Sequence, residues 1–125
     1  MTDKSSTDAA LDWDYPQSFV LDLTAKSEHI DGLNHVNNAV YVTWCEDSAW
    51  SHSADLGLSL KDYQSLNRAM AIRRSEFEYL QAAYLGDELK VATWLTATDN
   101  RLSLERRFQI IRARDNVTVL RARWE

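Results

Sequence analysis

The sequence has one cysteine and no long apolar run, and each scarcity excludes a class of protein. Cys45 has no second cysteine with which to form a disulfide, and no Cys or His pair nearby with which to build a metal site. No stretch approaches the roughly 18 apolar residues that a membrane-spanning helix needs. The opening segment MTDKSSTDAALDWDYP is polar and acidic, unlike a secretory signal. We therefore expect a cytoplasmic protein with no metal and no membrane segment.

Proline, glycine and basic clusters are also scarce. One proline and three glycines fit long regular elements joined by short turns. The formal net charge is −5, and the arginines near the C-terminus alternate with apolar residues, as on the solvated face of strands. A protein that follows nucleic-acid phosphates needs a basic surface, so we do not expect nucleic acid as a partner.

The 125 residues suit one domain, and 45% of them are apolar, which is enough to form a core. The polar segment at the N-terminus has little to bury. We expect residues 1–14 to form a flexible N-terminal segment and residues 15–125 to form the folded domain.

Alternation of apolar and polar residues predicts five strands. In QSFVLDLTAKS, Phe19, Leu21 and Leu23 fall on one face, as in a half-buried strand. Four more strands are predicted within residues 69–80, 86–98, 101–112 and 116–124. In the first of these the alternation slips near Arg73 and Arg74, and a bulge there would restore a single buried face.

The segment NNAVYVTWCEDSAWSHSADLG predicts a long helix. Asn37 or Asn38 suits the N-cap, and Gly57 suits the position just after the C-terminus. Apolar residues cover most of the circumference, so we expect burial on several sides at the centre of the fold. SLKDYQ (59–64) predicts one further short helix. An α+β fold follows, in which consecutive antiparallel strands curl around the helix.

The loop that enters this helix, residues 28–37, combines turn-forming residues with Asp31. The first turn of a helix leaves backbone N–H groups unpaired and partly positive, and such groups stabilise an oxyanion. A carboxylate beside them can activate water or attack a carbonyl. Asp31 precedes Asn38 by seven residues, so the pattern predicts an acyl site with a carbonyl held at the helix start.

The stretch IDGLNHVNNAVYVTWCEDSAW resembles the motif Asp-x-x-Gly-His-Val-Asn-Asn-x-x-Tyr of the hotdog-fold acyl-CoA thioesterases, in the 4-hydroxybenzoyl-CoA thioesterase-like group. FEYLQAAYLGDELKVATWL is similar to a second recurrent segment of that group, and the resemblance runs from about residue 17 to the C-terminus. It implies the hotdog fold, an antiparallel β-sheet wrapped around a long central α-helix. It also implies hydrolysis of an acyl-CoA thioester to a free acid and coenzyme A, without a cofactor.

The resemblance also implies roles for single residues. Asp31 matches the catalytic carboxylate, and Asn38 matches the residue whose backbone N–H polarises the thioester carbonyl. His35 is a third candidate catalytic residue, while Asn37 and Tyr41 are candidate substrate-binding residues. In the family the site lies at a dimer interface, so we expect a homodimer or homotetramer.

Two further arginines are candidate contacts for the substrate. Arg73 and Arg74 lie near the predicted bulge, where they could meet the phosphates of coenzyme A across that interface.

Two positions depart from the family motif. Asn34 stands where the family has Gly, and Asn is the next most tolerant residue for a left-handed turn, so we expect the loop to form. His29 stands where an acidic residue is often found, two positions before Asp31. This departure changes the charge beside the candidate site.

Simpler roles stay open for several of these residues. Asp31 is a common turn former, Asn37 and Asn38 can serve as caps alone, and His35 can be a structural residue. We expect Cys45 to be a small core residue and His52 a surface or interface residue. Glu46 either faces a wet gap or pairs with an arginine.

The function also has alternatives. The chain could act on acyl carrier protein thioesters, or it could be a non-catalytic acyl-CoA binding module. Its last segment, NVTVLRARWE, stops while its alternation still runs. We expect residues 117–125 to pair with 102–112, and the chain to be a truncated form of a slightly longer protein.

Overall fold

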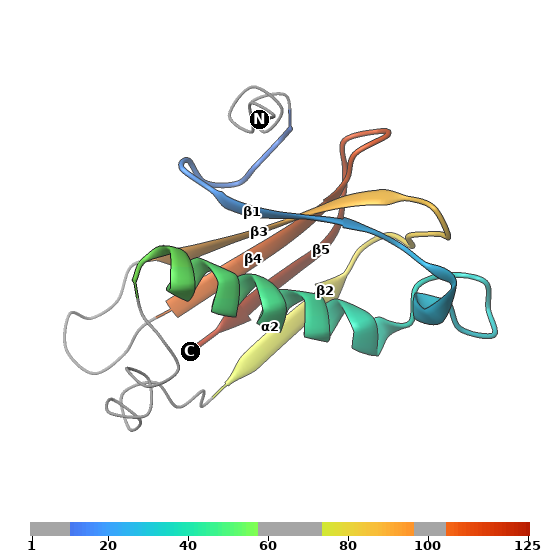
Figure 1. Cartoon of the computed structure of the whole chain (residues 1–125), viewed down its shortest axis with the longest axis horizontal. Coiled ribbons are helices and arrows are strands. Elements are labelled where there is room, and N and C mark those ends of the chain that lie inside the picture. The colour runs from blue at the N-terminus through green and yellow to red at the C-terminus, as the bar shows by residue number, and fades with distance from the viewer. Residues whose placement is uncertain (1–10, 58–73, 97–104) are drawn as a thin grey trace.

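The computed structural model describes residues 11–57, 74–96 and 105–125 (Figure 1). Its elements are β1 (Phe19–Thr24), the 3₁₀ turn η1 (Ser27–His29), the helix α2 (Asn38–Asp55), β2 (Ser75–Tyr79), β3 (Glu88–Thr96), β4 (Glu105–Arg112) and β5 (Val117–Trp124). The predicted long helix is confirmed, and each predicted strand has a counterpart. The short helix predicted at 59–64 lies outside the described residues, as does Arg73.

The five strands form one antiparallel sheet in the order β1-β3-β4-β5-β2. β4 pairs with β5 from Arg106↔Trp124 to Arg112↔Val117, as predicted for the chain's last strand. The prediction that strands consecutive in the chain pair with each other is wrong for β2, which pairs with β5 and not with β3. β3 already has β1 and β4 as neighbours, so residues 80–87 must cross the end of the sheet to connect β2 with β3.

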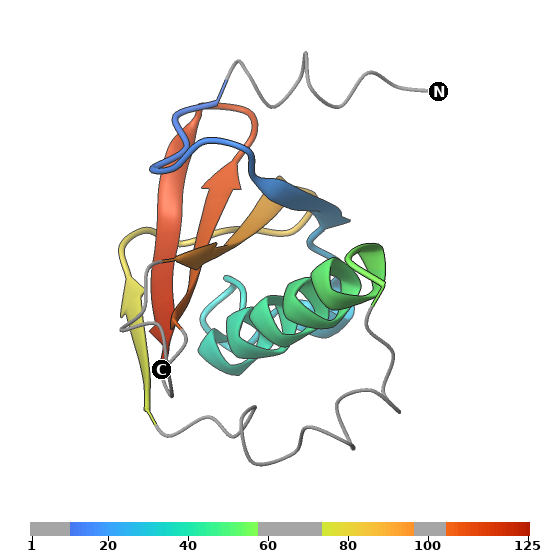
Figure 2. The ribbon, with the colours of Figure 1, turned by 90° about the vertical axis from the view of Figure 1, so that its left-hand side faces the viewer.

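α2 packs along one face of the curved sheet (Figure 2). The main core joins helix and sheet through a set of buried apolar side chains: Tyr41, Trp44, Cys45, Ala49, Leu89, Val91, Phe108, Ile110, Val119 and Leu120. This arrangement is the predicted α+β fold, with an antiparallel sheet around a long helix.

Burial of α2 on several sides is wrong for this chain by itself. The helix buries one face, formed by Tyr41, Trp44, Cys45, Ser48, Ala49 and Ser53. On the opposite face Thr43, Glu46 and Asp47 are exposed, and Trp50 is 48% exposed. One sheet covers one side of a helix, so the remaining apolar surface is left at the outside of the protomer.

A β-bulge interrupts the pairing of β4 with β5. Ile110 pairs with Leu120 and Ile111 pairs with Thr118, so Val119 is the extra residue. Its carbonyl oxygen accepts hydrogen bonds from the N–H groups of Leu80 (2.9 Å) and Gln81 (3.3 Å). The bulge therefore anchors the start of the 80–87 connection. The bulge predicted near Arg73 and Arg74 involves a residue outside the described ranges.

Part of the segment predicted to be flexible lies against the outer face of the sheet. The Trp13 ring contacts Trp94 edge to face at 6.1 Å between centroids. The Asp14 carboxylate pairs with Arg121 at 2.7 Å, and its backbone N–H donates to Gln109 Oε1 at 2.9 Å. Residues 11–14 thus belong with the folded domain, because they cover apolar surface that the helix does not reach.

Candidate active site

The loop between β1 and α2 is a closed hairpin. Ile30 and Val36 form an isolated antiparallel bridge, and the Asp31 N–H donates to the His35 carbonyl at 3.0 Å. Asn34 has a φ of +68°, the left-handed conformation for which Asn was expected to be tolerated. The chain therefore turns tightly through residues 31–35 and returns toward the start of the helix.

The Asp31 carboxylate is partly fixed by its own loop. Oδ1 accepts a hydrogen bond from the Leu33 N–H at 2.8 Å and lies 3.9 Å from Nδ1 of His35. The side chain is 26% exposed. Its contacts with the described residues use Oδ1 alone. The role of turn former is therefore observed.

The start of α2 has a backbone donor for which the described part of the chain offers no acceptor. Asn37 is the N-cap, and its Oδ1 accepts the Ala39 N–H at 2.9 Å. The Asn37 carbonyl accepts the Val40 N–H at 2.9 Å. Between them, the Asn38 N–H has no acceptor among the described residues. A free N–H with partial positive charge at a helix start can hold a carbonyl oxygen or an oxyanion.

His35 shares the loop with Asp31. Its Nδ1 lies 3.4 Å from the Val36 carbonyl oxygen, and its side chain is 34% exposed. When protonated, the imidazole can pair with the Asp31 carboxylate. Of the residues predicted from the sequence, Asp31, His35, Asn37 and Asn38 are thus brought together in one loop and one helix start.

Tyr41 is 2% exposed and joins the helix to the 80–87 connection. Its hydroxyl oxygen accepts the Ala83 N–H at 3.2 Å, and its ring packs against Trp44 and Tyr79. Burial raises the pKa of Tyr41. These contacts describe a side chain that ties two segments together, and a role in substrate binding stays a prediction.

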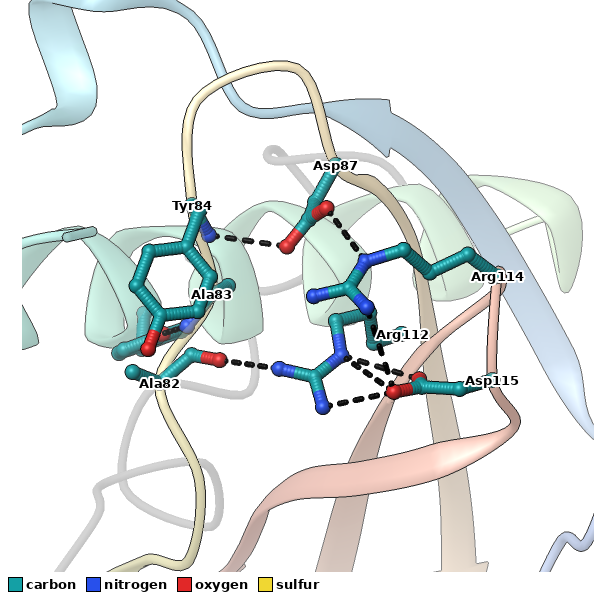
Figure 3. A network of polar contacts seen from close by, with 8 residues as sticks. Ala82, Ala83, Tyr84, Asp87, Arg112, Arg114 and Asp115 are labelled. Atoms are coloured by element: carbon teal, nitrogen blue, oxygen red, sulfur yellow. Dashed lines mark hydrogen bonds and ion pairs between the residues drawn. The ribbon is translucent and has the colours of Figure 1, made fainter.

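A polar network surrounds the same connection (Figure 3). Arg112 donates from Nη1 to the Ala82 carbonyl, and from Nε and Nη2 to the Asp115 carboxylate at 2.8–3.2 Å. Asp87 accepts the Tyr84 N–H at 2.9 Å and pairs with Arg114 at 3.0 Å. These bonds hold the backbone of residues 82–84 in one conformation.

Sequence reasoning missed two buried arginines. Arg106 and Arg112 are each 8% exposed, so both are exceptions to the prediction that most of the C-terminal arginines lie on a solvated face. Both lie on the side of the sheet that faces α2, because Arg112 is paired with the core residue Leu89 and Arg106 alternates with Phe108. An acidic residue three positions after Arg112, Asp115, was the one available signal.

Arg74 lies far from the candidate site within the protomer. Its backbone pairs with Glu125 beyond the end of β5, whereas Arg112 is paired with Val117 at the start of that strand. The length of β5 separates these positions by about 20 Å. The Arg74 side chain is 63% exposed and lies 3.6 Å from Glu76. One protomer therefore does not bring Arg74 to Asp31.

Cys45, Glu46 and His52 are the other residues considered from the sequence. Cys45 is fully buried and burial raises the pKa of its thiol, so the predicted core role is confirmed. Glu46 is exposed on α2. His52, expected to be a surface or interface residue, is half-buried in the protomer, stacks on Phe19 at 5.0 Å and accepts a hydrogen bond from Arg106 at 2.9 Å. No pattern in the sequence indicates that an arginine lies beside His52.

Two searches of the described residues concern other kinds of site. Within 11–57, 74–96 and 105–125, no group of three or more His, Cys, Asp or Glu side chains could hold a metal ion. No helix in these ranges is both long enough and apolar enough to cross a membrane.

Proteins of known structure share this fold. The 1,4-dihydroxy-2-naphthoyl-CoA thioesterase from Synechocystis has a TM-score of 0.75 at 19% identity, over 86% of this chain and 78% of that chain. A Staphylococcus aureus protein solved in complex with CoA has a TM-score of 0.75 at 25% identity, over 86% and 67%. An acyl-ACP thioesterase from Bacteroides thetaiotaomicron has a TM-score of 0.75 at 21% identity, over 86% and 43%.

The sequence points to the same family. No curated protein sequence matches this chain. The profile of the thioesterase-like superfamily matches residues 26–123, which include the Asp31 loop, α2 and all strands after it. The resemblance drawn from the motif is therefore confirmed, and this chain belongs to the thioesterase-like superfamily.

Proposed function

We propose that this chain hydrolyses an acyl-CoA thioester to a free carboxylic acid and coenzyme A. The observation that carries the proposal is the N–H of Asn38, which has no acceptor in residues 11–57, 74–96 and 105–125 and lies at the helix start that the Asp31 loop enters. A thioester carbonyl bound there would be polarised by the N–H, and the oxyanion that forms during attack would be stabilised by it. Asp31 supplies the negative group that hydrolysis needs on the other side of the carbonyl.

Asp31 can act in two ways. As a general base it would take a proton from water, which then attacks the carbonyl carbon; as a nucleophile it would form an acyl anhydride that water later cleaves. In either case the thiolate of coenzyme A leaves. In the base route the oxygen of water enters the acid directly, whereas water that attacks the Asp31 carbonyl of the anhydride gives its oxygen to Asp31, and the acid leaves with an oxygen from Asp31. The bond from the Leu33 N–H holds Oδ1 and fixes the direction of Oδ2. A single turnover in ¹⁸O-labelled water separates the two, because only the nucleophilic route puts label into the Asp31 carboxylate.

Coenzyme A as the thiol is supported by two relatives. The Synechocystis structure is named for hydrolysis of a CoA ester, and the Staphylococcus aureus structure contains CoA. The Bacteroides relative is an acyl-ACP thioesterase of the same fold, so acyl carrier protein thioesters are the second candidate substrate. Parallel assays with one acyl group carried by CoA and by acyl carrier protein distinguish the two by kcat/KM.

Substitution of Asp31 by Asn is the direct test. Asn keeps an oxygen that can accept the Leu33 N–H but cannot act as base or nucleophile, so turnover should fall at least roughly 10²-fold. Asp47→Asn is the matched control, because Asp47 is exposed on α2. Full turnover by the Asp31→Asn protein would remove Asp31 from the mechanism.

The same preparation distinguishes an enzyme from a binding module. If unmodified protein binds acyl-CoA by calorimetry but releases no free thiol with any acyl group tested, the chain is a binding module that keeps the fold. If it releases thiol with at least one acyl-CoA and Asp31→Asn does not, the enzyme proposal holds.

We also propose that the protein is at least a dimer. β2 is an edge strand of the sheet with exposed side chains, and edge strands are usually paired or covered. Because Arg74 lies at the far end of β5 from Asp31, its proposed contact with the phosphates of coenzyme A would require a second copy. Arg73 carries the same proposal on sequence grounds. Sedimentation equilibrium tests the assembly, and a fully active monomer would contradict it.

A further inference from the structure

We propose that Arg112 is a positioning residue for the candidate active site, acting through the backbone of Ala82 and Ala83. This inference rests on the proposed function and concerns a residue that contacts neither Asp31 nor Asn38 in the structure. Three layers of contacts connect Arg112 with the start of α2.

The first layer joins Ala83 to both sides of Asn38. The Val36 N–H donates to the Ala83 carbonyl at 2.9 Å, and the Ala83 N–H donates to the Tyr41 hydroxyl at 3.2 Å. Val36 lies two residues before Asn38 and closes the Asp31 hairpin, while Tyr41 lies three residues after it. The peptide groups of Ala83 therefore fix the entry and the first turn of the helix together.

The second layer holds Ala83 itself. Residues 80–87 connect β2 with β3 outside both strands. Backbone hydrogen bonds hold the two ends of this segment, from Leu80 and Gln81 to Val119 and from Gly86 to Ala25, and side chains contribute to holding its middle. Val119 anchors its start and Asp87 its end, and the Nη1 group of Arg112 binds the carbonyl of Ala82 in the middle.

The third layer holds the guanidinium. Asp115 accepts from Nε and Nη2 of Arg112, which aims Nη1 at Ala82 (Figure 3). These bonds raise the pKa of Arg112 and lower the pKa of Asp115. All three guanidinium nitrogens make hydrogen bonds within the protein and the residue is 8% exposed, so we assign Arg112 a positioning role and not a direct contact with substrate. The planar guanidinium of Arg112 can bind the Ala82 carbonyl and the Asp115 carboxylate at the same time, whereas the ammonium of a lysine is a compact group that cannot reach both in this geometry.

Arg112→Met is the main variant, and Arg121→Met is its matched control. Arg121 also makes a two-point contact with one aspartate, Asp14, but on the outer face of the sheet. Arg112→Lys is a second variant, which keeps the charge and one of the two contacts if Met prevents folding.

Steady-state kinetics with acyl-CoA give the first measurement. Misplacing the donor and the carboxylate should lower kcat of Arg112→Met about 10- to 100-fold and leave KM within about threefold, because substrate contacts are retained. Arg112→Lys should lie between this variant and the unmodified protein. In combination with Asp31→Asn, Arg112→Met should reduce turnover little further, because both changes affect one site. Normal kcat in Arg112→Met, with full activity in the unmodified protein, would overturn the inference.

Amide hydrogen exchange gives a second measurement that does not depend on turnover. In Arg112→Met the amides of residues 31–38 and 80–85 should exchange faster, while those of β3 and β4 stay protected. Arg121→Met should leave these segments unchanged. A uniform rise across the sheet, or no change near Asn38, would overturn the positioning role. If the unmodified protein turns over no acyl-CoA, the proposed function fails, and the exchange pattern still decides the role of Arg112.

Discussion

The two ends of α2 carry opposite kinds of polar group and use them differently. At the N-terminal end the Asn38 N–H has no acceptor among the described residues, which also make no contact with Oδ2 of Asp31. At the C-terminal end His52, in the last turn, stacks on Phe19 and accepts a hydrogen bond from the buried Arg106.

The helix macrodipole accounts for both arrangements. Its positive end favours anions near the N-terminus, and its negative end favours cations near the C-terminus. At the C-terminal end the cation is built into the protein and is bonded to His52 and Thr93. At the N-terminal end no described residue accepts the Asn38 N–H. The proposed binding of a thioester carbonyl at this end would supply an acceptor that the described residues do not provide.

The largest effect should come from removal of the Asn38 N–H. Asn38 is the first residue of α2, where proline is favourable, and Asn37 before it has φ −63° and ψ 135°, which suits a residue preceding proline. Asn38→Pro should therefore fold normally, while turnover falls about 10²- to 10³-fold because an oxyanion donor is lost.

Asn38→Ala is the control for this experiment, since it removes the side chain and keeps the N–H. It should retain turnover close to that of the unmodified protein. If the Pro variant is as active as the Ala variant, the N–H of Asn38 has no part in the reaction, and the two helix ends do not differ in the proposed way.

A smaller effect is expected from Asn37→Ala. The Ala39 N–H then loses its acceptor, so the free energy of unfolding should fall by about 1 kcal/mol in a denaturant titration. Turnover should fall far less than in Asn38→Pro. Asn37→Ser should restore stability because Ser is an equally good cap. A loss of turnover as large as that of Asn38→Pro would instead place the Asn37 side chain on the substrate, as the family motif implies.

At the C-terminal end of α2, His52 should make the free energy of unfolding depend on pH. Burial and the positive charge of Arg106 lower the pKa of His52 below its ordinary value of 6.5. The folded state then binds fewer protons at this site than the unfolded state does. The stability contributed by neutral His52 is complete above pH 6.5 and declines as the pH falls through the lowered pKa.

His52→Gln tests this contribution, because Gln can accept the Arg106 hydrogen bond but does not titrate. Between pH 7.5 and 5.5 the free energy of unfolding should fall less in the variant than in the unmodified protein. The other titrating groups cancel in the difference. Equal slopes would show that the surroundings of His52 do not depend on its protonation.

The features that could be predicted from the sequence are those determined by residues close to one another in the chain. The cap at Asn37, the left-handed Gly57 after α2 and the alternation in β1 each depend on residues close in the chain. Two features depended on distant partners and were missed. The pairing of β2 with β5 follows from which edges of the sheet are free, and the burial of Arg112 depends on a carbonyl 30 residues away.

The candidate site follows the same division. Asp31, His35 and Asn38 lie within one hairpin and one helix turn, so a motif of neighbouring residues could place them together. Tyr41 also belongs to the motif, but the role of its hydroxyl became visible only when residues 80–87 were seen to cross the sheet end. A pattern along the chain shows which residues lie close together locally. It does not show which backbone group from a distant segment a side chain will contact.

The smallest effect should come from the position where the loop departs from the family motif. Asn34 has a φ of +68°, so a glycine there would relieve the contact between Cβ and the backbone. Glycine would also widen the unfolded ensemble, which opposes that gain. Because Asn tolerates this conformation better than most residues, Asn34→Gly should change the free energy of unfolding by no more than about 0.5 kcal/mol. Turnover should stay within about twofold, since the bond from the Leu33 N–H to Asp31 does not involve the Asn34 side chain. Asn34→Val is the contrasting variant, because a β-branched residue is poorly tolerated at positive φ and should lower both stability and turnover. If Asn34→Gly alone raised turnover several-fold, the loop of the unmodified protein would limit the rate of the reaction at the N-terminal end of α2. Asn34 would then restrain the site and would not be a neutral replacement for glycine.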